Sequence, residues 1–369
     1  MFTHGHHYYK GRVALHVILR ALGIGEGDEV IVPGFTCLAV PLPILHLNAK
    51  PVYIDIESSS YNMDISQLGD LITPRTKVII AQHTFGIPLP MPVLMATANQ
   101  LGLSVIEDCC HTMSSTIGGK VVGSFGDAAF SSYEWGKPLM IGCGGSAFSK
   151  DCALREKLEI AYRESHAPTP METMTITLER FAYQKFYRPS LFWVLRRAFR
   201  SLGRLGLTVR TFEGSEMLGQ MRHINKRMPG FAERILKTAW EGLSEDERRS
   251  QRLVGLYKTG LREIGVACPA SPSGANVIYS RYPLQVRDKG RVLREAARSR
   301  IEVGDWFTEP VHPVPRSQWA QVGYTAGSCP VAETTVARII SLPLHRRILL
   351  SEVERTIEFL ARMKHEGAL

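Results

Sequence analysis

Several features that mark other classes of protein are absent from this chain of 369 residues. Its seven cysteines form no CxxC pair and no CxxH set, so we expect no zinc or other metal site and no complete disulfide framework. No run of about 18 uninterrupted apolar residues occurs, which argues against a membrane-spanning helix. The segment Met1–His7 lacks the charged start and apolar run of a secretory signal. We therefore expect a cytoplasmic protein.

Acidic residues are in the minority, with 35 Asp and Glu against 44 Lys and Arg, for a formal net charge of +9 at pH 7. This excess favours anionic partners such as phosphates, nucleic acid or an acidic membrane surface. Nucleic-acid binding would rest on net charge alone, without a recognised motif, and we do not expect it. With 44% hydrophobic and 21% charged residues, the composition is that of a globular protein large enough for two domains.

Continuous apolar runs separated by helical segments dominate the first part of the chain. We interpret these runs as buried strands at Glu29–Pro33, Pro51–Ile56, Lys77–Ala81 and Leu103–Asp108. This rhythm predicts an α/β fold with a parallel sheet covered on both faces, and such sheets bind ligands at the carboxyl ends of their strands. His83, Asp108 and Lys137 fall at or just beyond such ends. For Asp108 alone, capping a helix or pairing with an arginine is the alternative.

A lone lysine follows an apolar strand in the stretch Ser124–Leu139. A neutral lysine amine can attack a carbonyl and form a Schiff base, which makes Lys137 the candidate for the chemistry. A lysine that simply faces solvent on a loop is the alternative.

The segment from residue 180 to residue 210 is basic, with eight Lys and Arg residues and no Asp or Glu. Arg196, Arg200 and Arg204 recur at every fourth position, and apolar residues can form the opposite face of a helix. Two interpretations stay open for this amphipathic pattern. One is a solvated face on a core helix, and the other is contact with an anionic membrane surface or a lipid-linked substrate.

The last third of the chain has an α+β pattern. A long helix is predicted from Pro229 to about Glu263, with a break at Gly242 as one option. The elements expected after it are a strand at Val277–Val286 and helices at Gly290–Arg300, Ala332–Ile340 and Ser351–Lys364.

A series of short motifs stands in the order found in the sugar aminotransferases of the DegT/DnrJ/EryC1/StrS family. Gly27–Thr36 resembles the family's GDEVIVPxxT, and Glu107–His111 resembles its EDxAQ/H. The other similar segments are Pro51–Ile56, Tyr61–Asp64, Pro74–Lys77, Gln82–Gly86, Gly123–Asp127, Ser132 to Lys137 with Gly144 and Gly145, Cys329–Glu333 and Ser341–His345. Each motif alone is weak, but their shared order carries the resemblance across most of the chain.

The resemblance implies a fold type I enzyme that uses pyridoxal 5′-phosphate (PLP). A large PLP-binding domain at 11–235 would hold a mostly parallel seven-stranded sheet flanked by helices, and 236–369 would form a smaller C-terminal α+β domain. Residues 1–10 would be an N-terminal tail. The motifs on either side of the basic segment are farther apart than is usual in the family, which implies a basic helical insertion at about 167–212.

Site residues follow from the resemblance wherever the family's residue is present. Lys137 would hold the cofactor covalently, and Asp108 would face the pyridine nitrogen and keep it protonated. His111 would lie near the ring hydroxyl, with an ordinary core histidine as the alternative. Ser132 would bind the phosphate together with the main-chain N–H groups of Gly11 and Arg12, where a helix begins.

Two positions depart from the family pattern. Arg12 replaces a threonine that binds the phosphate, and it can supply a charge-assisted hydrogen bond instead. Cys37 stands where an aromatic residue often stacks on the cofactor. Asn225, in a segment similar to the family's GYNYRM, would reach the phosphate in the neighbouring subunit, which implies a homodimer with shared active sites.

The reaction implied is a ping-pong transamination from glutamate or glutamine to a keto sugar that is linked to a nucleotide. Arg227, Trp306 and His312 are the candidates for the substrate side, with interface packing as the alternative. A deoxysugar dehydratase of the same family is the alternative function, but those enzymes carry histidine in place of the lysine. The remaining alternative is a non-catalytic member of the family that acts as a regulator or associates with a membrane.

Overall fold

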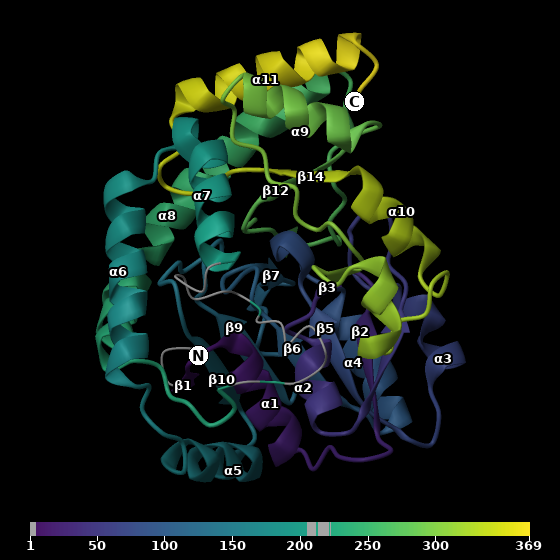
Figure 1. The fold of residues 1–369 in the computed structure, drawn as a ribbon. Helices are drawn as coiled ribbons and strands as arrows, with labels where there is room; N and C mark the ends of the chain where they lie inside the picture. The colour runs from purple at the N-terminus through teal and green to yellow at the C-terminus, as the bar shows by residue number, and fades with distance from the viewer. Residues whose placement is uncertain (1–4, 205–211, 213–220, 222) are drawn as a thin grey trace.

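The structure is a computed structural model that describes residues 5–204, 212, 221 and 223–369 (Figure 1). A seven-stranded sheet lies at its centre in the order β1-β10-β9-β6-β5-β2-β4. Its strands are β1 (His6–Tyr8), β2 (Glu29–Pro33), β4 (Lys50–Ile54), β5 (Thr76–Gln82), β6 (Ser104–Asp108), β9 (Ala128–Ser132) and β10 (Gly145–Ser149). Five of them, β4, β2, β5, β6 and β9, run parallel, whereas β10 and β1 add an antiparallel edge. The predicted α/β class with a mostly parallel sheet is confirmed.

Both faces of the sheet are buried, which explains why its strands read as continuous apolar runs. Val30 and Val32 on β2 join the hydrophobic cluster that contains Leu15 of helix α1 (Gly11–Ala21). Ile31 between them points to the opposite face, into the cluster that contains Leu94 of helix α4 (Met91–Leu101).

The parallel strands end next to one another at one edge of the sheet. Gln82 at the end of β5 pairs in register with Asp108 at the end of β6, and Asp108 pairs with Phe130 of β9. Strand β9 continues to Ser132. Helix α1 begins at Gly11 and packs against β9 and β10, so its first turn lies at the same edge.

The C-terminal part of the chain forms a second layer, at the top of Figure 1. Its helices are α8 (Gly230–Glu263), α9 (Lys289–Arg298), α10 (Pro330–Arg338) and α11 (Leu350–His365), beside a two-stranded sheet of β12 (Tyr282–Gln285) and β14 (Ile339–Leu342). Shorter or peripheral elements include α2 (Pro41–His46), α3 (Leu68–Leu71), α5 (Cys152–Arg163), β3 (Thr36–Cys37), β7 (Thr116–Ile117), β8 (Lys120–Val121), β11 (Ala275–Asn276) and β13 (Val311–His312).

Some predicted elements differ from the structure. The strand expected at Val277–Val286 is only β12, and the helix expected at Ala332–Ile340 ends at Arg338, where β14 begins. Helix α8 passes through Gly242 without a break. The boundary drawn between 235 and 236 falls inside α8, and the division into two domains stays a prediction.

The basic segment and the residues before it form helices α6 (Pro170–Phe186) and α7 (Phe192–Arg204), which lie at the left of Figure 1 and connect the two layers. Arg196 forms an ion pair with Asp305 instead of facing solvent, and the indole N–H of Trp193 donates to the carbonyl of Ile301 at 2.7 Å. The side chains of Arg200 and Arg204 lie outside the described residues. Helix α7 therefore packs against the segment of Ile301 and Asp305 through these two side chains.

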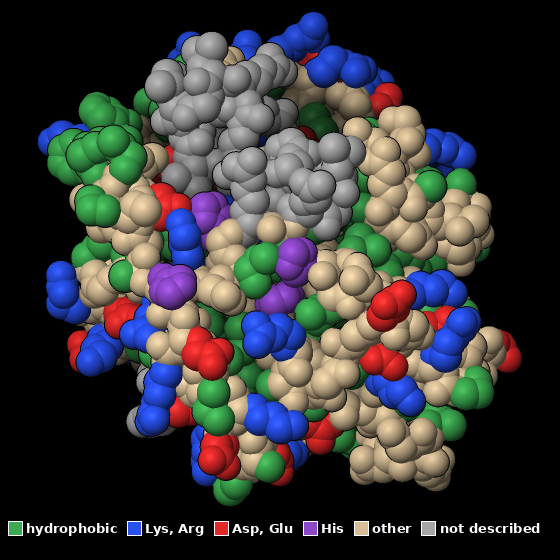
Figure 2. Space-filling view, turned by 60° about the horizontal axis from the view of Figure 1, so that its bottom comes forward, with side chains coloured by type: hydrophobic (Ala, Val, Ile, Leu, Met, Phe, Trp, Pro, Cys, Tyr) green, Lys and Arg blue, Asp and Glu red, His purple; other side chains and the backbone are tan. Residues whose placement is uncertain are grey.

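Helix α6 has an exposed apolar stripe. Met171, Met174, Leu178 and Phe181 are each between 50% and 66% exposed, and their spacing puts them on one face. Figure 2 shows hydrophobic side chains gathered at the left of the molecule, on the side of α6 in Figure 1. None of the described helices is long and apolar enough to cross a bilayer.

Candidate active site

Lys137 lies in the turn that follows β9. Its backbone N–H donates to the carbonyl of Glu134 at 3.2 Å, and its side chain is half-buried. The Nζ atom lies 5.0 Å from the centre of the Trp306 ring. The turn therefore directs the lysine toward the loop that carries Trp306 and away from open solvent.

Asp108 is buried at the end of β6. Its Oδ1 accepts a hydrogen bond from the backbone N–H of Cys110 at 2.9 Å. Burial raises the pKa of Asp108, while the charge of Lys137 and the hydrogen bond from Cys110 act in the opposite direction. A buried acid near a lysine is suited to bind a cationic group, because it has already lost most of its contact with water.

His111 is buried beside Trp306, with ring centres 4.9 Å apart in an edge-on arrangement. The backbone N–H of Phe85 donates to Nδ1 at 3.1 Å, so the proton of the neutral ring sits on Nε2. Burial lowers the pKa of His111 well below its usual value, and the nearby charges of Lys137 and Arg281 lower it further. His111 is therefore a neutral hydrogen-bond donor at pH 7.

Gly11 and Ser132 lie against each other at the start of α1. A Cβ on Gly11 would stand 2.9 Å from the Ser132 Cβ, so only glycine lets the helix approach the strand this closely. The first turn of a helix presents N–H groups without intrahelical partners and favours an anion. A hydroxyl beside such a turn fits a phosphate group, and the residues present therefore suit the phosphate of a cofactor.

Arg12 and Cys37 are near this cradle. Arg12 is buried, and its guanidinium lies 4.7 Å from the centre of the Phe212 ring. Burial raises the pKa of the Cys37 thiol, and the charges of Lys137 and Arg12 oppose this rise. Cys37 thus lies close enough to sense both cations, and it is a neutral thiol.

Trp306 and His312 belong to the loop before and within β13, which pairs with β3 so that His312 stands opposite Cys37. Their ring centres are 6.3 Å apart. The Nδ1 atom of His312 accepts from the backbone N–H of Thr308 at 3.2 Å. The structure thus brings Trp306 and His312 to the edge where Lys137 lies.

Asn225 and Arg227 are placed differently. Asn225 is exposed, and its backbone carbonyl accepts from the N–H of His166 at 2.7 Å. The guanidinium of Arg227 donates to the carbonyls of Tyr162 at 3.1 Å and Arg163 at 2.8 Å, at the end of α5. Within the described part of the chain, these contacts tie Arg227 to α5 and not to the turn of Lys137.

Two features of the site were not predicted. The first is a buried pair below Asp108, in which the His83 Nε2 and Glu107 Oε2 atoms are 3.2 Å apart. Burial alone would raise the pKa of Glu107, but His83 and backbone N–H groups from Gly123 and Gly126 lower it overall. Glu107 thereby fixes the loop before β9. The glutamate was visible in the sequence, where it precedes Asp108, but its partners are set by the fold.

The second is Arg281, just before β12. Its guanidinium lies 5.7 Å from the centre of the Trp306 ring. No motif marked this residue, because a single arginine within the strand expected at Val277–Val286 reads as a surface charge.

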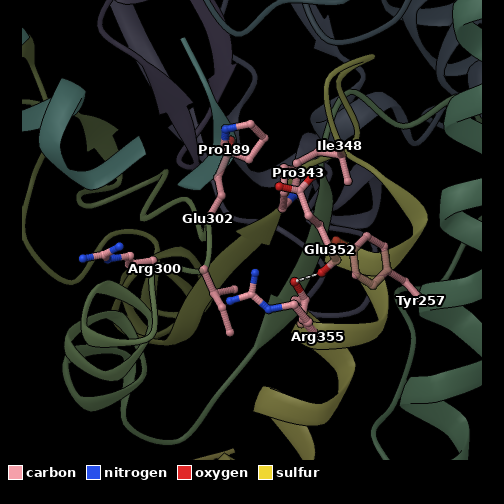
Figure 3. A pocket seen from close by; sticks show the side chains of 10 residues that line it. Pro189, Tyr257, Arg300, Glu302, Pro343, Ile348, Glu352 and Arg355 are labelled. Atoms are coloured by element: carbon pink, nitrogen blue, oxygen red, sulfur yellow. Dashed lines mark hydrogen bonds between the residues drawn. The ribbon is translucent and has the colours of Figure 1, made fainter. Parts of the chain in front are cut away.

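The cavity drawn in Figure 3 lies elsewhere, between the segment of Pro189 and residues of α8 and α11 such as Tyr257 and Glu352. Its volume of about 20 Å³ suits a water molecule and not a substrate. The Lys137 edge of the large sheet is therefore the candidate active site.

A lysine after β9, a buried acid at the end of β6 and a helix N-terminus lie at one edge of this seven-stranded sheet, which is the arrangement expected for a PLP-dependent transferase of fold type I. The chain belongs to the DegT/DnrJ/EryC1/StrS aminotransferase family, whose model matches residues 4–361. The predicted family, enzyme class and cofactor are confirmed.

Relatives in this family carry names of sugar-modifying enzymes. The chain is 29% identical over 365 residues to a UDP-N-acetyl-3-dehydro-alpha-D-glucosamine 3-aminotransferase of Acidithiobacillus ferrooxidans, covering 98% of this chain and 85% of that one. It is 26% identical over 337 residues to a UDP-2-acetamido-2-deoxy-3-oxo-D-glucuronate aminotransferase of Pseudomonas aeruginosa, covering 91% and 79%. A crystal structure of a family member from Brucella abortus has a TM-score of 0.76 at 23% identity, covering 98% and 86%. That likeness supports the fold.

Proposed function

We propose that the protein transfers an amino group from glutamate or glutamine to a keto sugar carried on a nucleotide, in a ping-pong reaction. The observation that carries this proposal is the convergence of Lys137 and Asp108 at the edge of the sheet, in a chain of this family. The names of the relatives support a nucleotide-linked sugar as acceptor.

Each site residue has a role that its surroundings suit. Lys137 would attach the cofactor covalently, and the buried Asp108 carboxylate would pair with the pyridine nitrogen and keep it protonated. Ser132 and the first turn of α1 at Gly11 hold the phosphate, and the Arg12 guanidinium adds a positive charge there. When bound, PLP supplies an electron sink that stabilises negative charge on the carbon being deprotonated.

The other residues orient the reactants. His111 would donate a hydrogen bond from Nε2 to the ring hydroxyl of the cofactor, and the Cys37 thiol would pack against the ring in place of an aromatic side chain. The freed Nζ atom of Lys137 takes a proton from the donor carbon and later returns one. Trp306 and His312 form the substrate side of the site and limit the access of water. Arg227 is proposed for the same side, and its ties to α5 suit a place at a subunit boundary.

The alternatives are less well supported. A dehydratase of this family has histidine where this chain has Lys137, and the relatives above are named aminotransferases. A non-catalytic regulator would not need the lysine, the acid and the phosphate cradle together. Cytoplasmic location stays a prediction.

We also propose a homodimer with shared active sites. Asn225 is exposed in a single chain, as expected for a residue that binds the phosphate in a neighbouring subunit. The Glu172–Lys226 and Glu172–His223 ion pairs hold the segment around Asn225 against α6. This placement suits an Asn225 side chain that extends into a neighbouring subunit.

We also propose contact with an anionic membrane surface. The basic segment pointed to α7 for this contact, but the structure favours α6. The stripe of Met171, Met174, Leu178 and Phe181 contains no acidic side chain, and the exposed Lys185 lies in the last turn of the helix. The two acids of α6 are half-buried, on its inner side. An apolar stripe with an exposed cation at its end fits a helix that lies in the plane of an anionic bilayer.

The experiment that tests the reaction combines spectroscopy with mapping. Purified protein should show a visible absorbance band that disappears on borohydride reduction, and the modified peptide should contain Lys137. With glutamate alone, one equivalent of keto acid should form per site. Absence of the band, or attachment at another lysine, would overturn the proposal.

A further inference from the structure

Arg281 lies between the two layers of the molecule, in contact with the turn that carries Lys137. A Cβ built on Gly136 would stand 2.5 Å from an Arg281 terminal nitrogen, so the arginine fills the space that this glycine leaves. Its guanidinium also lies 5.7 Å from the centre of the Trp306 ring, and Lys137 lies 5.0 Å from the same centre. Two cations therefore share one indole at the active site.

The guanidinium has no anionic partner among the described residues. Its Nε atom is buried and has no hydrogen-bond partner. The nearby acids are engaged elsewhere, since Glu302 binds Tyr187 and His345, and Asp305 pairs with Arg196. A partly buried guanidinium without a counter-ion is costly unless a ligand supplies the negative charge.

A second donor without a partner lies beside it. The Ser341 Oγ atom on β14 is buried and has no hydrogen-bond partner in the described structure. A Cβ on Gly304 would stand 2.4 Å from this hydroxyl and 3.2 Å from an Arg281 nitrogen. The guanidinium and the hydroxyl thus lie on either side of the same point, where the missing side chain of Gly304 leaves room for both groups.

We propose that Arg281, assisted by Ser341, binds the carboxylate of a substrate. A planar guanidinium matches a carboxylate with two parallel hydrogen bonds, and one hydroxyl can add a third. The α-carboxylate of the amino donor is attached directly to the carbon whose proton Lys137 moves, which accounts for the position of the arginine beside the lysine. The same chemistry would fit the carboxylate of a uronic acid sugar.

This inference rests on the proposed function and deepens it, because it assigns the group that holds a substrate acid. It also accounts for the two cations on one ring. Like charges at such short range repel one another, and a carboxylate between them neutralises one charge and is attracted by both. The neutral state of His111, which both cations favour, keeps a third positive charge away from the same place.

The test measures binding with inert carboxylates, so that it does not depend on turnover. Glutarate stands in for the donor and glucuronate for an acidic sugar, each titrated calorimetrically into the cofactor-loaded protein. Arg281→Gln should weaken the binding of one of them by about 10-fold or more, and Arg281→Lys should retain part of it because the charge remains. Arg287→Gln, a matched exposed arginine on the same segment, should leave both affinities unchanged.

The two arms identify the source of the carboxylate. A loss confined to glutarate assigns the site to the donor, and KM for glutamate should then rise while KM for the sugar stays the same. A loss confined to glucuronate assigns it to the sugar. Unchanged affinity for both, in an Arg281→Gln protein with the wild-type unfolding temperature, would overturn the inference. If glutarate binding depends on Arg281 but no donor yields keto acid, the carboxylate site stands and the proposed transamination fails.

Discussion

The Nζ atom of Lys137 lies 5.0 Å from the centre of the Trp306 ring, which joins the turn after β9 to the loop before β13. A cation over an indole contributes about 0.5–2 kcal/mol, depending on how much water is excluded. The contact matters more for position than for stability, because it ties the reactive lysine to a loop from the other layer. Groups that hold this loop should therefore influence the site.

Lys289 is one such group. Its ammonium donates to the carbonyls of Phe307 at 2.7 Å and Val336 at 2.9 Å. Burial lowers the pKa of Lys289 to about 8. Between pH 8 and 10.5 the unfolded chain binds more protons than the folded one, so wild-type stability should rise with pH relative to Lys289→Met across this window. The relative gain should be on the order of 3 kcal/mol at most.

Urea denaturation of both proteins at several pH values measures this difference. Below pH 8 lysine is protonated in both states, and the two stabilities should run parallel. Equal slopes above pH 8 would contradict the prediction and would place the ammonium in contact with water.

Asp108→Asn should keep the size of the buried side chain and remove its charge. Without that charge the pyridine nitrogen loses its proton, and amino transfer should fall by about 100-fold or more. Turnover with glutamate measures the loss, and the absorbance spectrum checks that the cofactor is still bound. Wild-type turnover in a variant with full cofactor would place Asp108 outside the reaction.

The ion pair of Arg196 and Asp305 should couple α7 to the Trp306 loop. Both side chains are mostly buried, so a double-mutant cycle with Arg196→Gln and Asp305→Asn should give a coupling of about 1 kcal/mol in urea denaturation. Arg197→Gln, at the exposed neighbouring position, should show no coupling with Asp305→Asn. Additive effects of Arg196 and Asp305 would mean that the pair does not hold the helix.

The exposed stripe of α6 gives a prediction about membranes. Leu178→Glu combined with Phe181→Glu should abolish flotation with liposomes that contain anionic lipid, because two charges would have to enter the apolar layer. Val93→Glu, at a single exposed apolar residue of α4, serves as the control and should leave flotation unchanged. Negligible binding of the wild-type protein would reject the membrane proposal, and a change in oligomeric state instead would assign the stripe to contact between copies.

The sequence predicted the parts of the molecule that depend on local pattern. Strands β2, β5 and β6 were visible because both faces are buried and the middle of each strand is a run of apolar residues. Asp108 was visible because it ends such a strand within a motif, and Lys137 because it follows one. These signals lie within a few residues of the group they identify.

Other features depend on residues far apart in the chain. Ile339–Leu342 continues a helical pattern and becomes β14 because it pairs with β12. Arg196 turns inward because Asp305 faces it from another layer. Arg281 becomes part of the site because Gly136 and Gly304 leave room on both sides. No local pattern in the sequence carries this information.

Shared active sites make a prediction that distinguishes them from independent subunits. Lys137→Ala and Asn225→Ala should each be nearly inactive as homodimers. If Asn225 acts across the interface, a mixed dimer has one site with both substitutions and one site with neither. Unfolding the two variants together and refolding them should therefore restore about a quarter of the wild-type activity, because half of the dimers are mixed and each has one intact site.

If Asn225 acts within its own chain, every site in the mixed dimer carries one substitution, and no activity should return. Refolded wild-type protein sets the scale, and refolding each variant alone gives the background.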